Sequence, residues 1–78
     1  MREIVLNVYN LSGIFHDEKT GKDISYKTAS VVVGHFDDSN NCNYITLHKA
    51  TSAVTEKAVG KSLKDCFYDR HGRIVSFR

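Results

Sequence analysis

The spacing of apolar residues changes part-way along this chain, and the change limits the folds that the chain can adopt. Up to about Leu47, apolar and polar residues alternate with a period of two, which is typical of strands with one buried face. From Ser52 to Tyr68 the apolar residues recur at helical spacing. The sequence therefore predicts an antiparallel sheet with one helix packed on it.

Three strands are expected in the alternating part. The first runs from Glu3 to Phe15, and Gly13 is expected to mark a bulge or bend near its end. The second covers residues 24–36, where three consecutive valines indicate a central strand with both faces at least partly covered. The third covers residues 44–48. The turns between them, residues 16–23 and 37–41, are rich in Gly, Asp and Asn, which favour tight turns.

Alternation also predicts which side chains face the core. In the third strand Ile45 and Leu47 are expected to point inward, and Tyr44, Thr46 and His48 outward. The same rule assigns the first-strand residues Ile4, Leu6 and Val8 to one face and Val5, Asn7 and Tyr9 to the other.

A helix is expected from Thr51 or Ser52 to about Tyr68, followed by a short last strand at residues 73–77. The helix would bury an apolar stripe of Val59, Leu63, Cys66 and Phe67 opposite Lys57, Lys61 and Lys64. The last strand is expected to run parallel to the first and to lie beside it. The predicted fold class is α+β, a single domain over residues 1–78 with the order βββαβ.

Gly60 supports a second interpretation of the same segment. Glycine in a helix interior costs about 1 kcal/mol relative to alanine, and a helix that ends at this position leaves Ser62 to Tyr68 free to form a strand. Residues 70–72 would then be a hairpin turn. Three strands, a helix and two more strands is the order of the five-stranded OB-type barrel, which commonly binds oligonucleotides.

Length and composition favour a binding protein over an enzyme. A 78-residue domain buries only about 60% of the surface of its unfolded chain, so few residues are left to build a deep active site. Two cysteines are too few for a disulfide scaffold, and Met1 is followed by Arg2 and Glu3 instead of an apolar run. We expect a cytoplasmic protein with reduced thiols, without a signal peptide, membrane span or cofactor.

The net charge of +2 is unevenly distributed. Residues 1–48 hold four basic and six acidic residues, a net charge of −2. Residues 49–78 hold seven basic and three acidic residues, a net charge of +4. The basic second half is thus a candidate contact for phosphates or for an acidic protein surface.

The histidines and cysteines lack the spacing of a metal site. His35, Cys42, His48 and Cys66 do not form the close pairs by which one loop delivers two ligands to zinc. A catalytic cysteine at position 42 would lie in an acidic turn, where the thiolate is disfavoured. A nucleophilic Ser39 would need His35 or His48 close by and a third group to orient that histidine.

The neighbouring acids Asp37 and Asp38 fit a solvated turn better than a pair of catalytic carboxylates. We therefore expect no catalytic residue and no metal ligand.

The leading functional hypothesis is a small non-enzymatic binding protein that covers a site on a host macromolecule. This is the behaviour of inhibitors and adaptors of phage or mobile-element type, and their partner is another protein or a protein–nucleic acid complex. Tyrosine and arginine supply much of the energy of protein interfaces. The expected contact residues are Tyr44, Thr46, His48, Arg70 and Arg73. An exposed first or third strand would also allow a homodimer.

The alternative hypothesis is a module that binds single-stranded nucleic acid through cations and exposed rings. Its candidate residues are Lys57, Lys61, Lys64, Arg70, Arg73, Arg78, Tyr26 and Tyr68. Tyr9 and Tyr44 are further tyrosines expected at the surface, whereas Phe15, Phe36, Phe67 and Phe77 are expected in the core.

Overall fold

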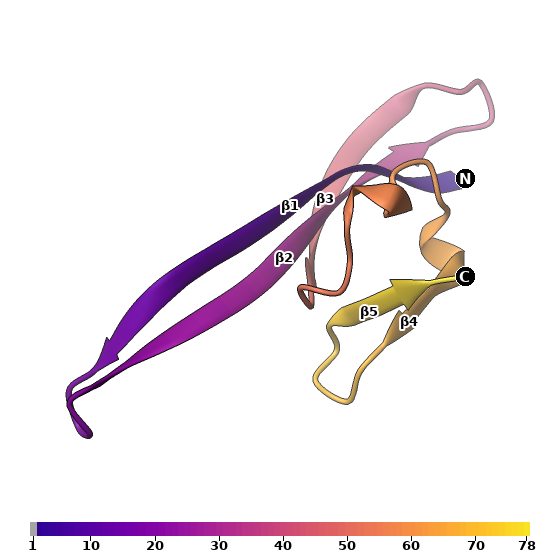
Figure 1. Cartoon of the computed structure of the whole chain (residues 1–78). Coiled ribbons are helices and arrows are strands. Elements are labelled where there is room, and N and C mark those ends of the chain that lie inside the picture. Colours follow the sequence, from indigo (N-terminus) through magenta and orange to yellow (C-terminus); the bar gives the residue numbers. More distant parts are fainter. Residues whose placement is uncertain (1) are drawn as a thin grey trace.

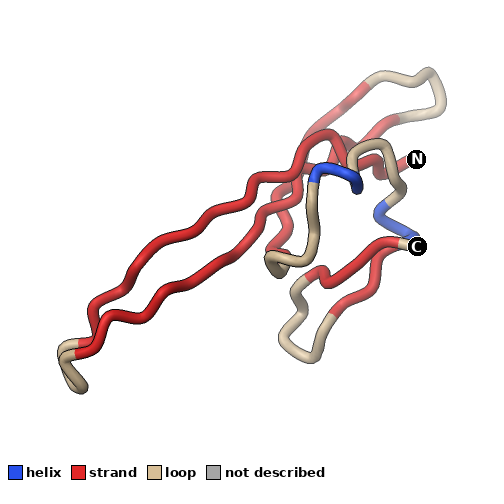
Figure 2. Tube along the Cα trace, in the orientation of Figure 1, coloured by secondary structure: helices blue, strands red, loops and turns tan. Residues whose placement is uncertain are grey.

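The computed structural model describes residues 2–78 and is built mainly from five strands (Figures 1 and 2). Two short 3-10 helices lie between the third and fourth strands. The elements are β1 (Arg2–Asp17), β2 (Lys22–Phe36), β3 (Cys42–Ala50), η1 (Glu56–Ala58), η2 (Leu63–Asp65), β4 (Cys66–Tyr68) and β5 (Ile74–Phe77).

All five strands belong to one mixed sheet in the order β1-β2-β3-β5-β4. The first three form the predicted antiparallel meander. The last strand does not lie beside the first, so that prediction is wrong: β5 runs parallel to β3, where Ala50 pairs with Ile74, and antiparallel to β4. Instead, the Val5 N–H donates to the Lys61 carbonyl (2.9 Å) and the Gly60 N–H donates to the Val5 carbonyl (2.8 Å). These bonds curl the chain back towards β1 and partly close the sheet.

The β1–β2 hairpin extends far beyond the rest of the sheet (Figure 1). The molecule measures 55 × 22 × 20 Å, and β3 pairs with β2 only as far as Ala29. Beyond that point two strands continue alone to a turn in which Gly21 has φ +70° and the Asp17 carboxylate accepts from the Lys19 N–H (3.0 Å). We call residues 11–28 the arm and the other described residues the body.

The predicted helix is wrong, because within residues 2–78 helical structure is limited to η1 and η2. The α+β order βββαβ is therefore replaced by a mostly β fold. Gly60 has φ +91°, a left-handed conformation that an α-helix does not contain. Each 3-10 helix has its own N-cap, since the side chains of Thr55 and Ser62 accept from the backbone N–H groups of Lys57 and Lys64. Two local caps and a glycine break the single helix that the apolar spacing predicted.

The second interpretation predicts three strands followed by two more correctly, but its helix is replaced by two 3-10 helices and one strand is shorter than expected. Three strands are followed by helical turns and two strands, and Gly72 has φ +79° in the turn of the last hairpin. The strand expected over residues 62–68 is limited to Cys66–Tyr68, because η2 occupies the residues before it.

A bulge at Leu6 changes the faces predicted for β1. The register shifts between Val5 and Asn7, and one extra residue moves the following side chains to the opposite face. As a result Val5 and Val8, three residues apart, are both buried, while Leu6 is 41% exposed. Gly13, where a bulge was predicted, stays in regular register.

The core consists of small side chains on the concave side of the sheet. Its members are Val5, Val8, Ala29, Val31, Val33, Ala50, Val54, Ala58 and Ile74, with Leu63, Cys66 and Phe77 packed at the margin. Phe15 and Phe67, predicted in the core, are 59% and 48% exposed, whereas Phe36 and Phe77 are half-buried. Without a covering helix there is no second layer to bury the larger rings.

Candidate nucleic-acid interface

The convex face of the arm carries large apolar side chains. In an antiparallel pair, directly opposed residues point to the same face, and Asn10 is opposite buried Ala29 on the core side. The other set of alternating residues therefore faces away from the core. From the base of the arm outward this set is Tyr9, Leu11, Gly13 and Phe15 on β1 and Ser30, Thr28, Tyr26 and Ile24 on β2. At the tip it ends with Asp17 opposite Lys22. We call the eight residues before this tip pair the outer face of the arm, and this name includes Tyr9 and Ser30, which form the row at its base.

The ring of Tyr26 is held over the backbone of β1 at Gly13. A Cβ atom at Gly13 would lie 2.5 Å from the Tyr26 hydroxyl oxygen and 2.7 Å from Cζ, so only glycine leaves room for the ring in this position. The side chain is nevertheless half exposed. One side of the ring is thus supported by the strand, and the other remains open to a ligand.

Basic side chains surround the base of the arm. The register aligns Tyr9, Ser30 and Lys49 in one row across β1, β2 and β3. The next row contains Thr28, whose hydroxyl donates to the Ala50 carbonyl (3.4 Å).

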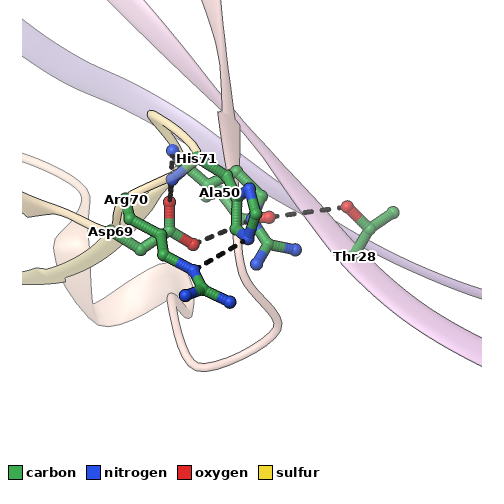
Figure 3. Close-up of polar contacts among 6 residues, drawn as sticks. Thr28, Ala50, Asp69, Arg70 and His71 are labelled. Atoms are coloured by element: carbon green, nitrogen blue, oxygen red, sulfur yellow. Dashed lines mark hydrogen bonds and ion pairs between the residues drawn. The ribbon is translucent and has the colours of Figure 1, made fainter.

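The β4–β5 loop, residues 69–73, lies beside Ala50, because Ile74 directly after the loop pairs with that residue (Figure 3). The loop brings Arg70, His71 and Arg73 to the base of the arm.

Asp69 organises this loop. Its Oδ1 accepts from the backbone N–H groups of His71 and Arg73 (both 2.9 Å), and its Oδ2 accepts from Nε of Arg73 (2.9 Å). The backbone hydrogen bond from Arg73 is the largest effect that lowers the pKa of the Asp69 carboxyl, and the Arg73 side chain and the His71 N–H lower it further. Asp69 therefore fixes the loop conformation that presents Arg70 and Arg73.

The other predicted cations are not part of this surface. Lys57 and Lys61 line a shallow cleft of about 200 Å³ between residues 53–58 and 75–77, and Lys61 Nζ donates to the Arg78 carbonyl (3.1 Å). Lys64 lies in η2. The predicted basic set is therefore divided between the β4–β5 loop and the segment that contains η1 and η2.

Tyr68 also lies away from the arm, in β4. A side-chain hydrogen bond with Cys66 is the largest of the effects that raise the pKa of Tyr68 to about 12; burial and the charges of Cys66 and Glu3 act in the same direction. At neutral pH its phenol is a neutral hydrogen-bonding group.

The faces predicted for β3 are reversed. Thr46 and His48 oppose buried residues of β2 and lie on the core side, whereas Ile45 and Leu47 are 58% and 71% exposed. The polar groups of Thr46 and His48 are satisfied on this side by hydrogen bonds. Oγ1 of Thr46 lies 2.8 Å from Nε2 of His48 and 2.8 Å from Nε2 of buried His35. A hydroxyl has one proton, so Thr46 donates to one imidazole and accepts from the other.

Tyr44 and Glu3 complete this polar cluster. The Tyr44 ring stacks on His35 with centroids 4.3 Å apart, and Glu3 Oε2 lies 3.7 Å from Nδ1 of His35. Of the predicted protein-binding residues, Tyr44, Thr46 and His48 are therefore together on the concave side. Arg70 and Arg73 lie in the separate β4–β5 loop.

The remaining sequence candidates have structural partners. The Asp37 carboxylate accepts from the N–H groups of Ser39 and Asn41 in the β2–β3 turn. Cys42 Sγ contacts the Tyr44 carbonyl at 3.6 Å, while His35 and His48 bond to Thr46. In the part of the chain that the structure describes, no group of three or more His, Cys, Asp or Glu side chains is placed to hold a metal ion.

The binding residues predicted from the sequence do not include several residues of the outer face, nor Lys49 in the row of Tyr9 and Ser30. Leu11, Phe15 and Lys49 were not in the predicted binding sets, and Gly13 was expected only to bend the strand. The alternation of residues 9–15 against residues 24–30 is the signal that groups them. Grouping these residues from the sequence would have required the register of the β1–β2 hairpin, because alternation alone does not show which face of the hairpin is uncovered.

The chain shows no significant match to a family model, a curated protein or a solved structure. Residues 2–78 contain no helix with the length and apolar character needed to span a bilayer.

Proposed function

We propose that this protein binds single-stranded nucleic acid, with bases stacked on the outer face of the arm and phosphates held by basic side chains at its base. The ring of Tyr26 over Gly13 is the observation that carries the proposal. Proteins that bind single strands combine exposed aromatic rings with a basic groove. A ring already supported by the backbone loses little conformational freedom when a base stacks on it.

The charges near this surface suit a polyanion. The eight outer-face residues include no acidic side chain. Lys49 lies in the row of Tyr9, and Arg70 and Arg73 lie in the loop beside Ala50. Phosphate repulsion from this face of the arm is therefore limited to Asp17 at the tip, where Lys22 lies opposite it. Three cations lie at the base, and one of them, Arg73, is paired with Asp69 in the absence of ligand.

The topology supports the same proposal by analogy. The strand order, the helical turns before β4 and the partial closure through Val5 resemble the layout of OB-type barrels, which bind oligonucleotides on strands 2 and 3 and on the loops that flank them. Fold alone does not fix function, so the proposal depends on the rings and cations.

We propose binding without catalysis, in the cytoplasm. Cys42 and Cys66 are both free thiols, a state that a reducing compartment maintains.

Anisotropy of a labelled oligothymidylate at low salt tests the proposal. Tyr26→Ala is expected to weaken binding by about 5-fold to 150-fold, because loss of one stacked base costs about 1–3 kcal/mol. Tyr44→Ala is the matched control: the two tyrosines are 50% and 51% exposed, but Tyr44 stacks on His35 on the concave side. Equal effects of the two substitutions, or no binding by the native chain, would refute the proposal.

The salt dependence gives a second measure. With three cations on phosphates, the logarithm of the association constant should fall against the logarithm of salt concentration with a slope of about −2. Arg73→Ala should make this slope shallower by about 0.7, whereas Lys57→Ala, in the cleft between residues 53–58 and 75–77, should leave it unchanged.

A second candidate is the binding of a protein, as an inhibitor or adaptor, through the convex face of β3. The observation that favours it is the exposure of Ile45 and Leu47, 58% and 71%, on a face that no element covers within residues 2–78. Leu47→Lys should then abolish capture of a host protein and leave oligothymidylate binding intact.

A further inference from the structure

We infer that this protein forms a two-fold symmetric dimer in which the free edges of two β1 strands pair antiparallel, with Ser12 at the centre. The inference does not depend on nucleic-acid binding. It starts from the backbone groups of β1 that have no partner strand in the described chain.

The direction of the β1 backbone groups follows from the register. Val5 bonds to residues 60 and 61, on the side away from β2. In antiparallel strands this orientation recurs at every second residue. Val5 and Val8 oppose Val33 and Val31, which are two residues apart on β2, so the Val8 backbone groups also point away from β2.

The even-numbered residues from Asn10 to His16 continue this pattern along the arm. The Val8 N–H is already bonded to Asn7 Oδ1 (2.8 Å), which leaves the open edge beyond it. Among residues 2–78, no strand pairs with this side of β1 in the arm (Figure 1).

The composition of this edge suits a second copy of the chain. Strand edges are usually protected from pairing by lysine, proline or an inward charge. The chain contains no proline, and β1 has no charged residue from Ile4 to Phe15. By contrast, the open side of β2 in the arm contains the charged residues Lys27 and Asp23. The β1 edge can therefore meet its own copy without bringing like charges together.

One register brings the open segments together and keeps their faces aligned. Pairing Ser12 with Ser12 of the second copy places Asn10 opposite Ile14. On the outer face it places Tyr9 opposite Phe15 and Leu11 opposite Gly13, next to the Tyr26 ring. Aromatic cross-strand pairs stabilise sheets, and a lone two-stranded ribbon is marginal in water. The dimer converts two such ribbons into one four-stranded sheet.

Sedimentation equilibrium without nucleic acid tests the inference with two matched proline variants. Ser12→Pro removes an N–H from the open edge of β1 and, by symmetry, both central hydrogen bonds. It should raise the dimer dissociation constant at least about tenfold. Ser25→Pro removes an N–H from the opposite edge of the same arm, since Ser25 opposes Ile14 and its N–H also points outward. It should leave the native dimer, twice the 8.8 kDa chain mass, intact.

Amide hydrogen exchange of the native protein provides a readout that does not depend on how the variants fold. The Ser12 and Ile14 amides should be protected at concentrations where the dimer forms and should lose protection on dilution. The Gly13 amide, which faces β2, should keep it. A monomer at all concentrations, equal loss of the dimer in both variants, or fast exchange of Ser12 in a dimer would each overturn the inference.

Discussion

The arm and the body use their apolar residues in opposite ways. The apolar side chains that the body buries are valines, alanines and one isoleucine, and the largest fully buried ones are Ile74, Val5, Val31 and Val33. In the arm no residue is buried, yet residues 11–28 include Leu11, Ile14, Phe15, Ile24 and Tyr26, all between 49% and 74% exposed.

This difference assigns different roles to the two regions. Burial of one large apolar side chain stabilises a fold by about 1.5–3 kcal/mol, and the arm gains almost none of this. A two-stranded ribbon of this length adds little to the stability of the monomer. The arm's large side chains are therefore explained by contacts with other molecules, and the small core of the body is what holds the chain folded.

Matched isoleucine substitutions give the largest contrast between the regions. Ile74→Ala, in the core, should destabilise the protein by about 2–5 kcal/mol, because it leaves a cavity at a fully buried site. Ile14→Ala, at a side chain 74% exposed in the arm, should change stability by less than about 0.5 kcal/mol. Urea denaturation followed by circular dichroism measures both, and equal effects would contradict the division into arm and body.

Gly13→Ala should reduce oligothymidylate affinity by about 5-fold or less, a smaller effect than removal of the Tyr26 ring. The added Cβ would displace the ring without unfolding the strand, because the crowded atoms are the far end of a side chain. Gly34→Ala is the control: its Cβ would meet Leu6 and Phe36 in the body instead of Tyr26. Anisotropy measures affinity, and loss of binding in the control alone would place the ligand on the body.

The smallest expected effect is the pH response of the β4–β5 loop. Hydrogen bonds from Arg73 and His71 lower the pKa of Asp69 from its ordinary value of 3.8. Its carboxylate therefore stabilises the loop fully above that value, and the contribution is lost as pH falls through the lower folded pKa. The amide chemical shifts of His71 and Arg73 should titrate together below pH 3.8, and Asp69→Asn should abolish the transition. A transition at or above 3.8 would contradict this assignment.

The sequence predicted the parts of this fold that depend on local turn and strand chemistry. Gly21 and the acidic turn at residues 37–41 define the three antiparallel strands, and Gly72 marks the last hairpin. The helix prediction failed because Val59, Leu63, Cys66 and Phe67 have helical spacing for an unrelated reason. Val59 caps η1, Leu63 lies in η2, and the other two lie in β4. Gly60 separates Val59 from the rest, and its N–H donates to the carbonyl of Val5, far away in the sequence.

The candidate site was predicted only in part, because its composition also depends on contacts between residues far apart in the sequence. Tyr26, Arg70 and Arg73 can be named from residue type, but Lys57, Lys61 and Lys64 were grouped with them through a helix that does not form. The reversed faces of β3 depend on long-range register and on the bond that Thr46 makes with His35 and His48. Alternation divides the side chains of a strand between two faces, but it does not show which of the two faces packs against the core.

Chemical-shift mapping of the isotope-labelled protein during titration with oligothymidylate tests the central claim most directly, since it shows which region the ligand touches. The account predicts the largest shifts at Leu11, Gly13 and Tyr26, with smaller shifts at Arg70 and Arg73 and none at the cleft containing Lys57. Shifts confined to that cleft, or to the concave cluster around His35, would contradict it.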